Sequence, residues 1–354
     1  MKNLLTSLLF PFSLVYGTIL YLRNKLYDSG VFRSTAFDFP LIVVGNLNIG
    51  GVGKTPHVEY LVQLLKNTSK VATLSRGYKR KTTGFLLANL DSTASSIGDE
   101  PLQYKKKFNI IPVAVDEKRV RGVQLLKEKH PEINTVILDD AYQHRALKAG
   151  INILITDFNN LYINDVVLPV GRLREWKCGS DRADIIIVSK SPHNLSLKER
   201  TKTIQNLNPK LHQSVFFSYL KYGELIPGNE TGKSLTTSIK DTSILLITGI
   251  ANPTPLLKEL EHHYKNIKHI SFNDHHQFTN QDIIQIKNSF KKLTGNKIII
   301  TTEKDFMRLS SPKILIELKD IPLYYIPIEV KFHGDDKEHF DSQILNYVAA
   351  NTGN

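Results

Sequence analysis

A strand-like run, a glycine-rich turn and a helical pattern follow one another in VVGNLNIGGVGKTPHVEYLVQLL, residues 43–65. Glycines let backbone N–H groups face a β-phosphate, and the positive end of the following helix attracts the same group. In such a loop the lysine, here Lys54, reaches the β- and γ-phosphate oxygens, and the Thr55 hydroxyl ligates Mg²⁺. The residues predicted to bind the nucleotide are Asn48, Ile49, Gly50, Gly51, Val52, Gly53, Lys54 and Thr55. Asn48 replaces the first glycine of the usual pattern, and asparagine also tolerates a left-handed backbone.

Two adjacent carboxylates, Asp139 and Asp140, directly follow the apolar run VIL at residues 136–138. A phosphate loop needs an acidic residue at the end of a neighbouring strand to hold the metal. A helix-capping aspartate would explain one carboxylate but not the pair together with His144. The sequence therefore predicts a Mg-nucleotide site in which Thr55, Asp139 and Asp140 hold the metal.

Two further clusters could supply a general base. Asp99 and Glu100 lie in SIGDEPLQY, and His275 and His276 lie in SFNDHHQFT. If these segments meet, an imidazole from one and a carboxylate from the other could deprotonate an acceptor hydroxyl. Taken singly, each cluster is more typical of a helix cap or a solvated turn.

The composition describes a folded protein that attracts anions. Hydrophobic residues make up 41% of the 354 residues, which excludes general disorder, and the net charge is +12. The basic clusters KRKTTG and YKKKF lack the aromatic and glycine pattern of an RNA-binding module, so no nucleic-acid partner is expected. Nothing in the sequence indicates an obligate protein partner.

A single cysteine, Cys178, excludes an internal disulfide framework and favours a reducing compartment.

The first part of the chain is apolar. Residues 4–22, LLTSLLFPFSLVYGTILYL, carry no charge, and a helix of this length measures about 28 Å, close to a hydrocarbon core of ~30 Å. Polar residues dilute the run, and Tyr16 and Tyr21 are typical of a membrane interface. We therefore expect a membrane-associated helix that spans the bilayer or lies at its surface. The alternative is a core helix that packs on the following domain.

Buried strands alternate with helical patterns along the rest of the chain. The predicted strands of the first half are LIVVGN, KVATLSRGY, NIIPVAV, NTVILDD, INILITD and ADIIIVSK. Such runs are typical of an α/β protein of the P-loop NTPase type, with a mostly parallel sheet and helices on both faces. A second, smaller α/β series begins near residue 240. The predicted parts are the N-terminal helix at 1–28, a P-loop kinase core at 29–212, a linker at 213–239 and a C-terminal α/β lobe at 240–354.

Two classes of protein fit these patterns. One is a membrane-associated switch ATPase related to chromosome-partitioning proteins, whose loop also reads Gly-Gly-Val-Gly-Lys-Thr. Those proteins carry a lysine just before the paired glycines, where this sequence has Ile49. The other class is a small-molecule or lipid kinase, which needs a base and an acceptor site in addition to the loop.

Several motifs occur together and in a fixed order. They are YGTILYLRNKLYDSG, VVGNLNIGGVGKTP, LSRGYKRK, GDEP, ILDDAYQHR, LPVGRLRE, FNDHHQFT and TTEKDFMRL. In this order, and over nearly the whole chain to about residue 308, the sequence resembles the tetraacyldisaccharide 4'-kinase family of lipid A synthesis. Ala141 stands where the family usually has glycine, and Asn273 where it usually has proline. Neither departure changes a proposed chemical group.

The resemblance implies a specific reaction and location. Members transfer the γ-phosphate of ATP to the 4'-hydroxyl of a tetraacylated glucosamine disaccharide 1-phosphate, giving lipid IVA, at the cytoplasmic face of the Gram-negative inner membrane. By the same resemblance, Asp99 pairs with His275 to activate the hydroxyl, and Lys54 binds phosphate. It also implies that Arg119, Arg174 and Glu175 lie near the phosphate and the lipid headgroup.

Overall fold

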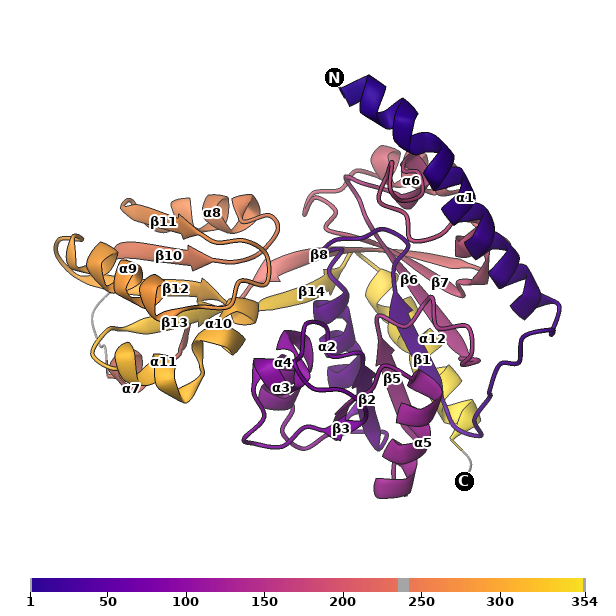
Figure 1. Cartoon of the computed structure of the whole chain (residues 1–354), viewed down its shortest axis with the longest axis horizontal. Helices are drawn as coiled ribbons and strands as arrows, with labels where there is room; N and C mark the ends of the chain where they lie inside the picture. Colours follow the sequence, from indigo (N-terminus) through magenta and orange to yellow (C-terminus); the bar gives the residue numbers. More distant parts are fainter. Residues whose placement is uncertain (1, 235–241, 353–354) are drawn as a thin grey trace.

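The chain folds into two α/β lobes that lie side by side (Figure 1). A computed structural model describes residues 2–234 and 242–352. Residues 235–239, which were expected to complete the linker, lie outside these ranges. The sequence-based prediction of an α/β protein with a mostly parallel sheet and helices on both faces is confirmed.

The larger lobe is built on a nine-stranded sheet in the order β14-β8-β7-β6-β1-β5-β2-β4-β3. Its strands are β1 (Leu41–Gly45), β2 (Val71–Ser75), β3 (Leu86–Leu87), β4 (Val113–Val115), β5 (Thr135–Asp139), β6 (Ile151–Asp157), β7 (Ile185–Ser189), β8 (Ser214–Tyr222) and β14 (Ile328–Phe332). All neighbours are parallel except β3 with β4 and β14 with β8. The two antiparallel strands therefore form the edges.

Helices cover both faces of this sheet, which explains its continuous Val/Ile/Leu strands. Along β1, Ile42 and Val44 pack into one hydrophobic core, whereas Leu41 and Val43 pack into a second, because successive side chains of a strand point to opposite faces. The helices of this lobe are α2 (Lys54–Leu65), α3 (Ala94–Ile97), α4 (Asp99–Lys107), α5 (Arg119–Lys129), α6 (Leu197–Leu207) and α12 (Asp336–Asn351), with short 3₁₀ helices η1 (Tyr162–Asn164) and η2 (Lys177–Arg182). Side chains of α2 and α12 belong to the first core, and those of α5 and α6 to the second.

The smaller lobe has a five-stranded sheet in the order β11-β10-β12-β13-β9. Its strands are β9 (Ile226–Pro227), β10 (Ser243–Thr248), β11 (Ile267–Ser271), β12 (Lys297–Thr302) and β13 (Leu323–Ile326). They are parallel except for β9. The accompanying helices are α7 (Glu230–Lys233), α8 (Thr254–Glu261), α9 (Asn280–Lys291), α10 (Glu303–Leu309) and α11 (Pro312–Glu317).

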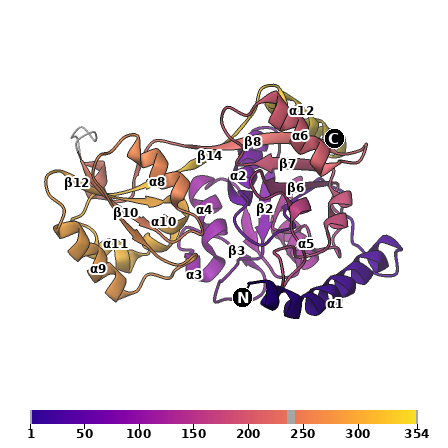
Figure 2. The same cartoon turned by 90° about the horizontal axis from the view of Figure 1, so that it is seen from above.

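The division between the lobes differs from the predicted linker and C-terminal lobe. Strand β8, in the expected linker, pairs with β7 and so belongs to the large sheet. The apolar run IPLYYIPIEV forms two strands in different sheets, β13 and β14, because Pro327 interrupts it. Strand β14 and helix α12 then return to the large lobe, where Asp336 accepts a hydrogen bond from the Phe217 amide over 2.8 Å. Figure 2 shows β8 and β14 as the two strands that link the lobes.

The lobes also meet through helices α2, α4 and α10. Helix α10 packs against α4. Lys107 of α4 lies between two buried carboxylates, with its Nζ 2.8 Å from Glu59 of α2 and 3.4 Å from Glu303 of α10. This shared cation holds the small lobe against the helices that follow the phosphate loop.

Helix α1 (Lys2–Asp28) runs along the outside of the large lobe (Figure 1). One face docks through Ser13 and Gly17, which are buried, and through Asn24, which donates a hydrogen bond to Glu175 over 2.6 Å. Gly17 permits this close packing, because a Cβ atom at this position would lie 2.6 Å from the Trp176 ring and the ring would have to shift. The opposite face exposes large apolar side chains, among them Phe12 and Ile19. Within residues 2–234 and 242–352, none of the helices has the length and apolar character needed to cross a membrane.

Candidate active site

The phosphate loop lies between β1 and α2, as the sequence predicts. Gly50 and Gly53 adopt positive φ angles of 120° and 92°, which disfavour residues with a Cβ atom. The ammonium group of Lys54 lies 2.9 Å from Asn46 Oδ1 and 3.5 Å from Asp140 Oδ1. The loop lysine is therefore already directed toward the acidic pair at the end of β5.

Asp139 ends β5, directly beside β1 in the sheet. Its Oδ2 accepts a hydrogen bond from the Tyr104 hydroxyl over 3.0 Å, whereas its buried Oδ1 has no hydrogen-bond partner within the described ranges. Burial, reinforced by the charge of Asp140, raises the pKa of Asp139 to about 6. Burial alone would also raise the pKa of Asp140, but attraction to Lys54 and Arg174 outweighs it and lowers that pKa.

The residues of this region fit a magnesium ion that is held partly by the nucleotide. In the described parts of the chain, no group of three or more His, Cys, Asp and Glu side chains could hold a metal ion. Mg²⁺, however, is commonly bound through one or two carboxylates together with substrate phosphates and water. The free Oδ1 of Asp139 is a ligand of that kind, and Asp140 and Thr55 belong to the same region.

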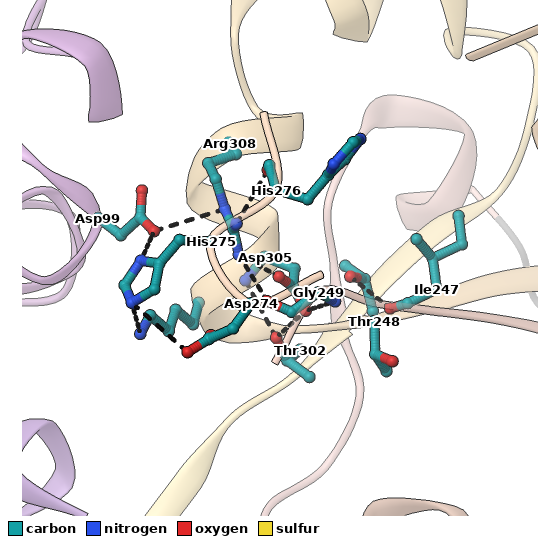
Figure 3. A network of polar contacts seen from close by, with 12 residues as sticks. Asp99, Ile247, Thr248, Gly249, Asp274, His275, His276, Thr302, Asp305 and Arg308 are labelled. Carbon is teal, nitrogen blue, oxygen red and sulfur yellow. Dashed lines mark hydrogen bonds and ion pairs between the residues drawn. The ribbon is translucent and has the colours of Figure 1, made fainter. Parts of the chain in front are cut away.

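The structure brings Asp99 and His275 together from different lobes (Figure 3). Asp99 is the first residue of α4, and His275 lies in the loop between β11 and α9. Their contact joins Asp99 Oδ2 and His275 Nδ1 over 3.0 Å, and both side chains are largely buried. Neither helix cap nor solvated turn accounts for this contact, which places an imidazole against a carboxylate at the junction of the lobes.

A lysine that sequence reasoning did not single out fixes the tautomer of His275. The ammonium of Lys304, in α10, lies 3.0 Å from His275 Nε2. Because an ammonium can only donate, Nε2 accepts, and the ring proton on Nδ1 is donated to Asp99. Lys304 also pairs with Glu100 over 2.9 Å. Burial alone would lower the pKa of Lys304, but attraction to Glu100 outweighs it and raises that pKa.

Arg308 is a second residue that the sequence did not indicate. Its Nε lies 3.5 Å from Asp99 Oδ2, and its side chain also pairs with Asp305, one turn earlier in α10. It donates a further hydrogen bond over 2.9 Å to the backbone oxygen of His276 (Figure 3). Arg308 therefore ties Asp99 to the loop that carries His275. The only sequence signal for Lys304 and Arg308 is that both lie in the motif TTEKDFMRL.

The three predicted substrate-binding residues lie in different surroundings. Arg119 is buried, with Nε and Nη2 unpaired within the described residues, and burial lowers its pKa to about 10. Arg174 is partly exposed and donates to Asp140 over 2.8 Å. Glu175 is buried and pairs with Arg182 over 2.9 Å, in addition to its hydrogen bond with Asn24. Arg119 and Arg174 therefore lie near the acidic pair, whereas Glu175 holds helix α1 against the lobe.

These features define a class of protein. A phosphate loop at the edge of a parallel sheet, an acidic strand end beside it and a His–Asp contact supplied by two lobes are the parts of a P-loop kinase. Partitioning-type switch ATPases are not favoured, because Ile49 occupies the position of their additional lysine and the second lobe contributes the histidine.

Comparison with known proteins identifies the family. The family model for tetraacyldisaccharide-1-P 4'-kinase matches residues 5–349. The chain is 45% identical over 357 residues to the tetraacyldisaccharide 4'-kinase of Bacteroides thetaiotaomicron, covering 98% of this chain and 94% of that relative. It is 44% identical over 349 residues to the enzyme of the same name from Flavobacterium johnsoniae, covering 99% of both. The chain belongs to the tetraacyldisaccharide-1-P 4'-kinase family, which confirms the resemblance.

A solved structure of the same family supports the fold. LpxK from Aquifex aeolicus, determined in complex with ATP, superimposes with a TM-score of 0.73 at 28% sequence identity. The similarity covers 97% of this chain and 99% of that chain, so both lobes and α1 fall within it. The protein is therefore a kinase with the architecture of this family.

We expect Asp139→Asn to stabilise the free protein at pH 7, because folding raises the pKa of this carboxyl to about 6. Such a carboxyl stabilises the folded protein at pH values below its pKa in the unfolded chain, which is about 4. This stability is lost as the pH rises through the pKa of the carboxyl in the folded protein. The gain should be about 1–3 kcal/mol at pH 7 and should vanish near pH 4. Denaturant unfolding of both proteins at each pH measures it.

Asp140→Asn is the matched control, and its effect should have the opposite sign. Lys54 and Arg174 overcome the effect of burial and lower the pKa of Asp140, so its charged form stabilises the folded protein. Loss of that charge should reduce the free energy of unfolding at pH 7. If both substitutions shift the free energy of unfolding in the same direction, the opposite pKa shifts assigned to Asp139 and Asp140 are wrong.

Proposed function

We propose that this kinase transfers the γ-phosphoryl group of ATP to the 4'-hydroxyl of a tetraacyldisaccharide 1-phosphate, giving lipid IVA. Family membership and the names of the relatives support the acceptor, and the ATP complex of the Aquifex aeolicus protein supports the donor. The observation that carries the proposal is the 3.0 Å contact between Asp99 and His275. A switch ATPase needs no such base, whereas a kinase must deprotonate its acceptor.

In the proposed mechanism, His275 accepts the proton of the 4'-hydroxyl on Nε2. That atom must first be released by Lys304, whose ammonium can remain paired with Glu100 at 2.9 Å. The proton that Nδ1 donates to Asp99 stays in place, and the carboxylate stabilises the imidazolium that forms. Arg308, 3.5 Å from the same carboxylate, limits its rotation and so keeps the imidazole in position.

Lys54 and two arginines would bind the transferring phosphoryl group. The Lys54 ammonium and the Arg174 guanidinium both lie beside Asp140, and Arg119 has unpaired N–H groups that can donate to phosphate oxygens. Thr55, Asp139 and Asp140 would hold Mg²⁺, which supplies positive charge to the phosphate oxygens when bound. Glu175 would act indirectly by fixing α1 and the adjoining segment of Arg174.

Helix α1 would place the site at the cytoplasmic face of the bacterial inner membrane, where an acylated substrate resides. One of its faces is docked on the large lobe, and the other exposes Phe12, Val15 and Ile19. An exposed apolar helix face inserts at the headgroup level, and a net charge of +12 adds attraction to anionic lipids. The membrane surface and the lipid substrate are therefore the proposed partners.

The reaction is tested by incubating the protein and Mg²⁺ with ATP labelled in its γ-phosphate and the tetraacyldisaccharide 1-phosphate. We expect label on the lipid and none on a soluble disaccharide that lacks acyl chains. Hydrolysis of ATP without transfer to the lipid would contradict the proposal. The same assay, followed over time, gives kcat for the variants below.

Replacing either member of the His–Asp pair should impair chemistry more than nucleotide binding. We expect His275→Gln and Asp99→Asn each to lower kcat by about 10²-fold or more, the usual contribution of a general base. Their dissociation constants for ATP, measured by calorimetry, should stay within about threefold of the unaltered protein, because neither residue touches the phosphate loop. Lys54→Met should weaken both binding and turnover.

The neighbouring histidine provides the matched control. His276 Nε2 pairs with Asp282 over 2.9 Å and does not contact Asp99. His276→Gln should therefore keep kcat close to that of the unaltered protein. If His275→Gln turned over as fast as His276→Gln, the proposed base would be wrong.

Membrane binding should depend on the exposed face of α1. The double variant Phe12→Glu/Ile19→Glu should bind vesicles of anionic phospholipid at least about tenfold more weakly, because two large apolar side chains no longer enter the interface. Sedimentation with the vesicles measures the change. Ile284→Glu, at an exposed position of α9 in the small lobe, is the control and should sediment normally. Equal sedimentation of both variants would exclude α1 as the anchor.

A further inference from the structure

Three consecutive carbonyl oxygens of the phosphate loop each accept a hydrogen bond from a side chain outside the loop. The pairs are Lys190 with Gly51, Ser189 with Val52 and His57 with Gly53. The Ser189 hydroxyl lies 2.6 Å from its carbonyl oxygen, and His57 Nδ1 lies 2.7 Å from the oxygen of Gly53. The chemistry proposed above uses none of these three donors.

Holding these oxygens determines where the loop directs its N–H groups. In a trans peptide, the carbonyl and the following N–H point in opposite directions. Fixing the oxygens of Val52 and Gly53 therefore turns the N–H groups of Gly53 and Lys54 to the other side. N–H groups at the start of the helix after such a loop are the ones that bind phosphate.

The hydrogen bonds of His57 define its state. The carbonyl oxygen of Gly53 can only accept, so Nδ1 carries the proton, and Nε2 then accepts from the Ser218 hydroxyl at 2.9 Å. The ring thus links the loop to β8, the strand that leads into the small lobe.

The other two donors lie where β7 ends. Ser189 is buried, and its hydroxyl lies nearer to the Val52 oxygen than to that of Thr156, which is 3.1 Å away. Lys190 has a left-handed backbone with φ 54°, and its ammonium also pairs with Asp157 of β6 over 3.1 Å. The ends of β6 and β7 therefore support the loop from the sheet.

We propose that Lys190, Ser189 and His57 are positioning residues that keep the phosphate loop in its nucleotide-binding form without contacting the nucleotide. The proposal rests on the proposed function, because it assumes that the loop binds ATP. It assigns a role to VSK, residues 188–190, a segment of the sequence that the chemistry leaves unused.

The test uses single variants of the full chain. Ser189→Ala, Lys190→Met and His57→Leu each remove one donor and keep most of the side-chain bulk. The dissociation constant for ATP with Mg²⁺ should rise about tenfold in each variant, which corresponds to about 1.4 kcal/mol. The KM for the lipid should not change. Lys190→Arg retains a cationic donor and should bind ATP within about twofold of the unaltered protein.

Ser191→Ala is the matched control. Ser191 is also buried and lies two residues after Ser189, but its hydroxyl donates over 2.8 Å to the backbone oxygen of Ser218 rather than to the loop. This variant should bind ATP normally. The proposal would be overturned if Ser189→Ala bound ATP with unchanged affinity. It would also be overturned if both serine variants lost ATP affinity equally and both had lower melting temperatures. ATP binding by the unaltered protein without phosphorylation of the lipid would overturn the proposed function alone. Absence of ATP binding would overturn both.

Discussion

The contact between Asp99 and His275 joins the two lobes, and the proposed chemistry depends on it because each lobe supplies one of the two partners. Helix α10 packs against α4, and Lys107 bridges carboxylates of α2 and α10. Arg308 joins Asp99 to the backbone beside the histidine. In the proposed mechanism, the small lobe brings the imidazole of His275 to a site that the large lobe forms around Lys54.

The site is also a concentration of buried charge that is not fully paired within the described chain. Asp139 has an oxygen without a partner, and Arg119 has two unpaired nitrogens. Buried polar groups normally find partners, and their absence costs free energy. These unpaired groups are the ones that would bind a metal and phosphate oxygens. Leaving them unpaired lowers the free energy of unfolding of the free protein at the proposed binding site.

Two paired strands connect the lobes. Strands β8 and β14 pair with each other, and one leads into the small lobe while the other returns from it. Helix α12 then anchors the returning chain, and its Asp336 forms an ion pair with Arg200 of α6 over 2.6 Å. The C-terminal segment therefore stabilises the large lobe, although it follows the small lobe in sequence.

Features that depend on near neighbours along the chain could be predicted from the amino-acid sequence. Glycine at positive φ, a lysine and threonine at a helix start, and aspartates after an apolar strand each have a local cause, so the loop, Asp139 and most strands were predictable. The family resemblance added the pairing of Asp99 with His275, which spacing alone left open.

Contacts between segments that are distant in sequence became known only from the folded chain. Lys304 and Arg308 contact residues that are distant in sequence, and Glu175 holds α1. Strand β14, which was expected in the C-terminal lobe, pairs with β8 in the large sheet. Periodicity shows that a strand or helix is buried but not against which partner. The partner is set by packing and charge pairing among segments that meet only in the folded chain, and this is why these contacts could not be read from the sequence.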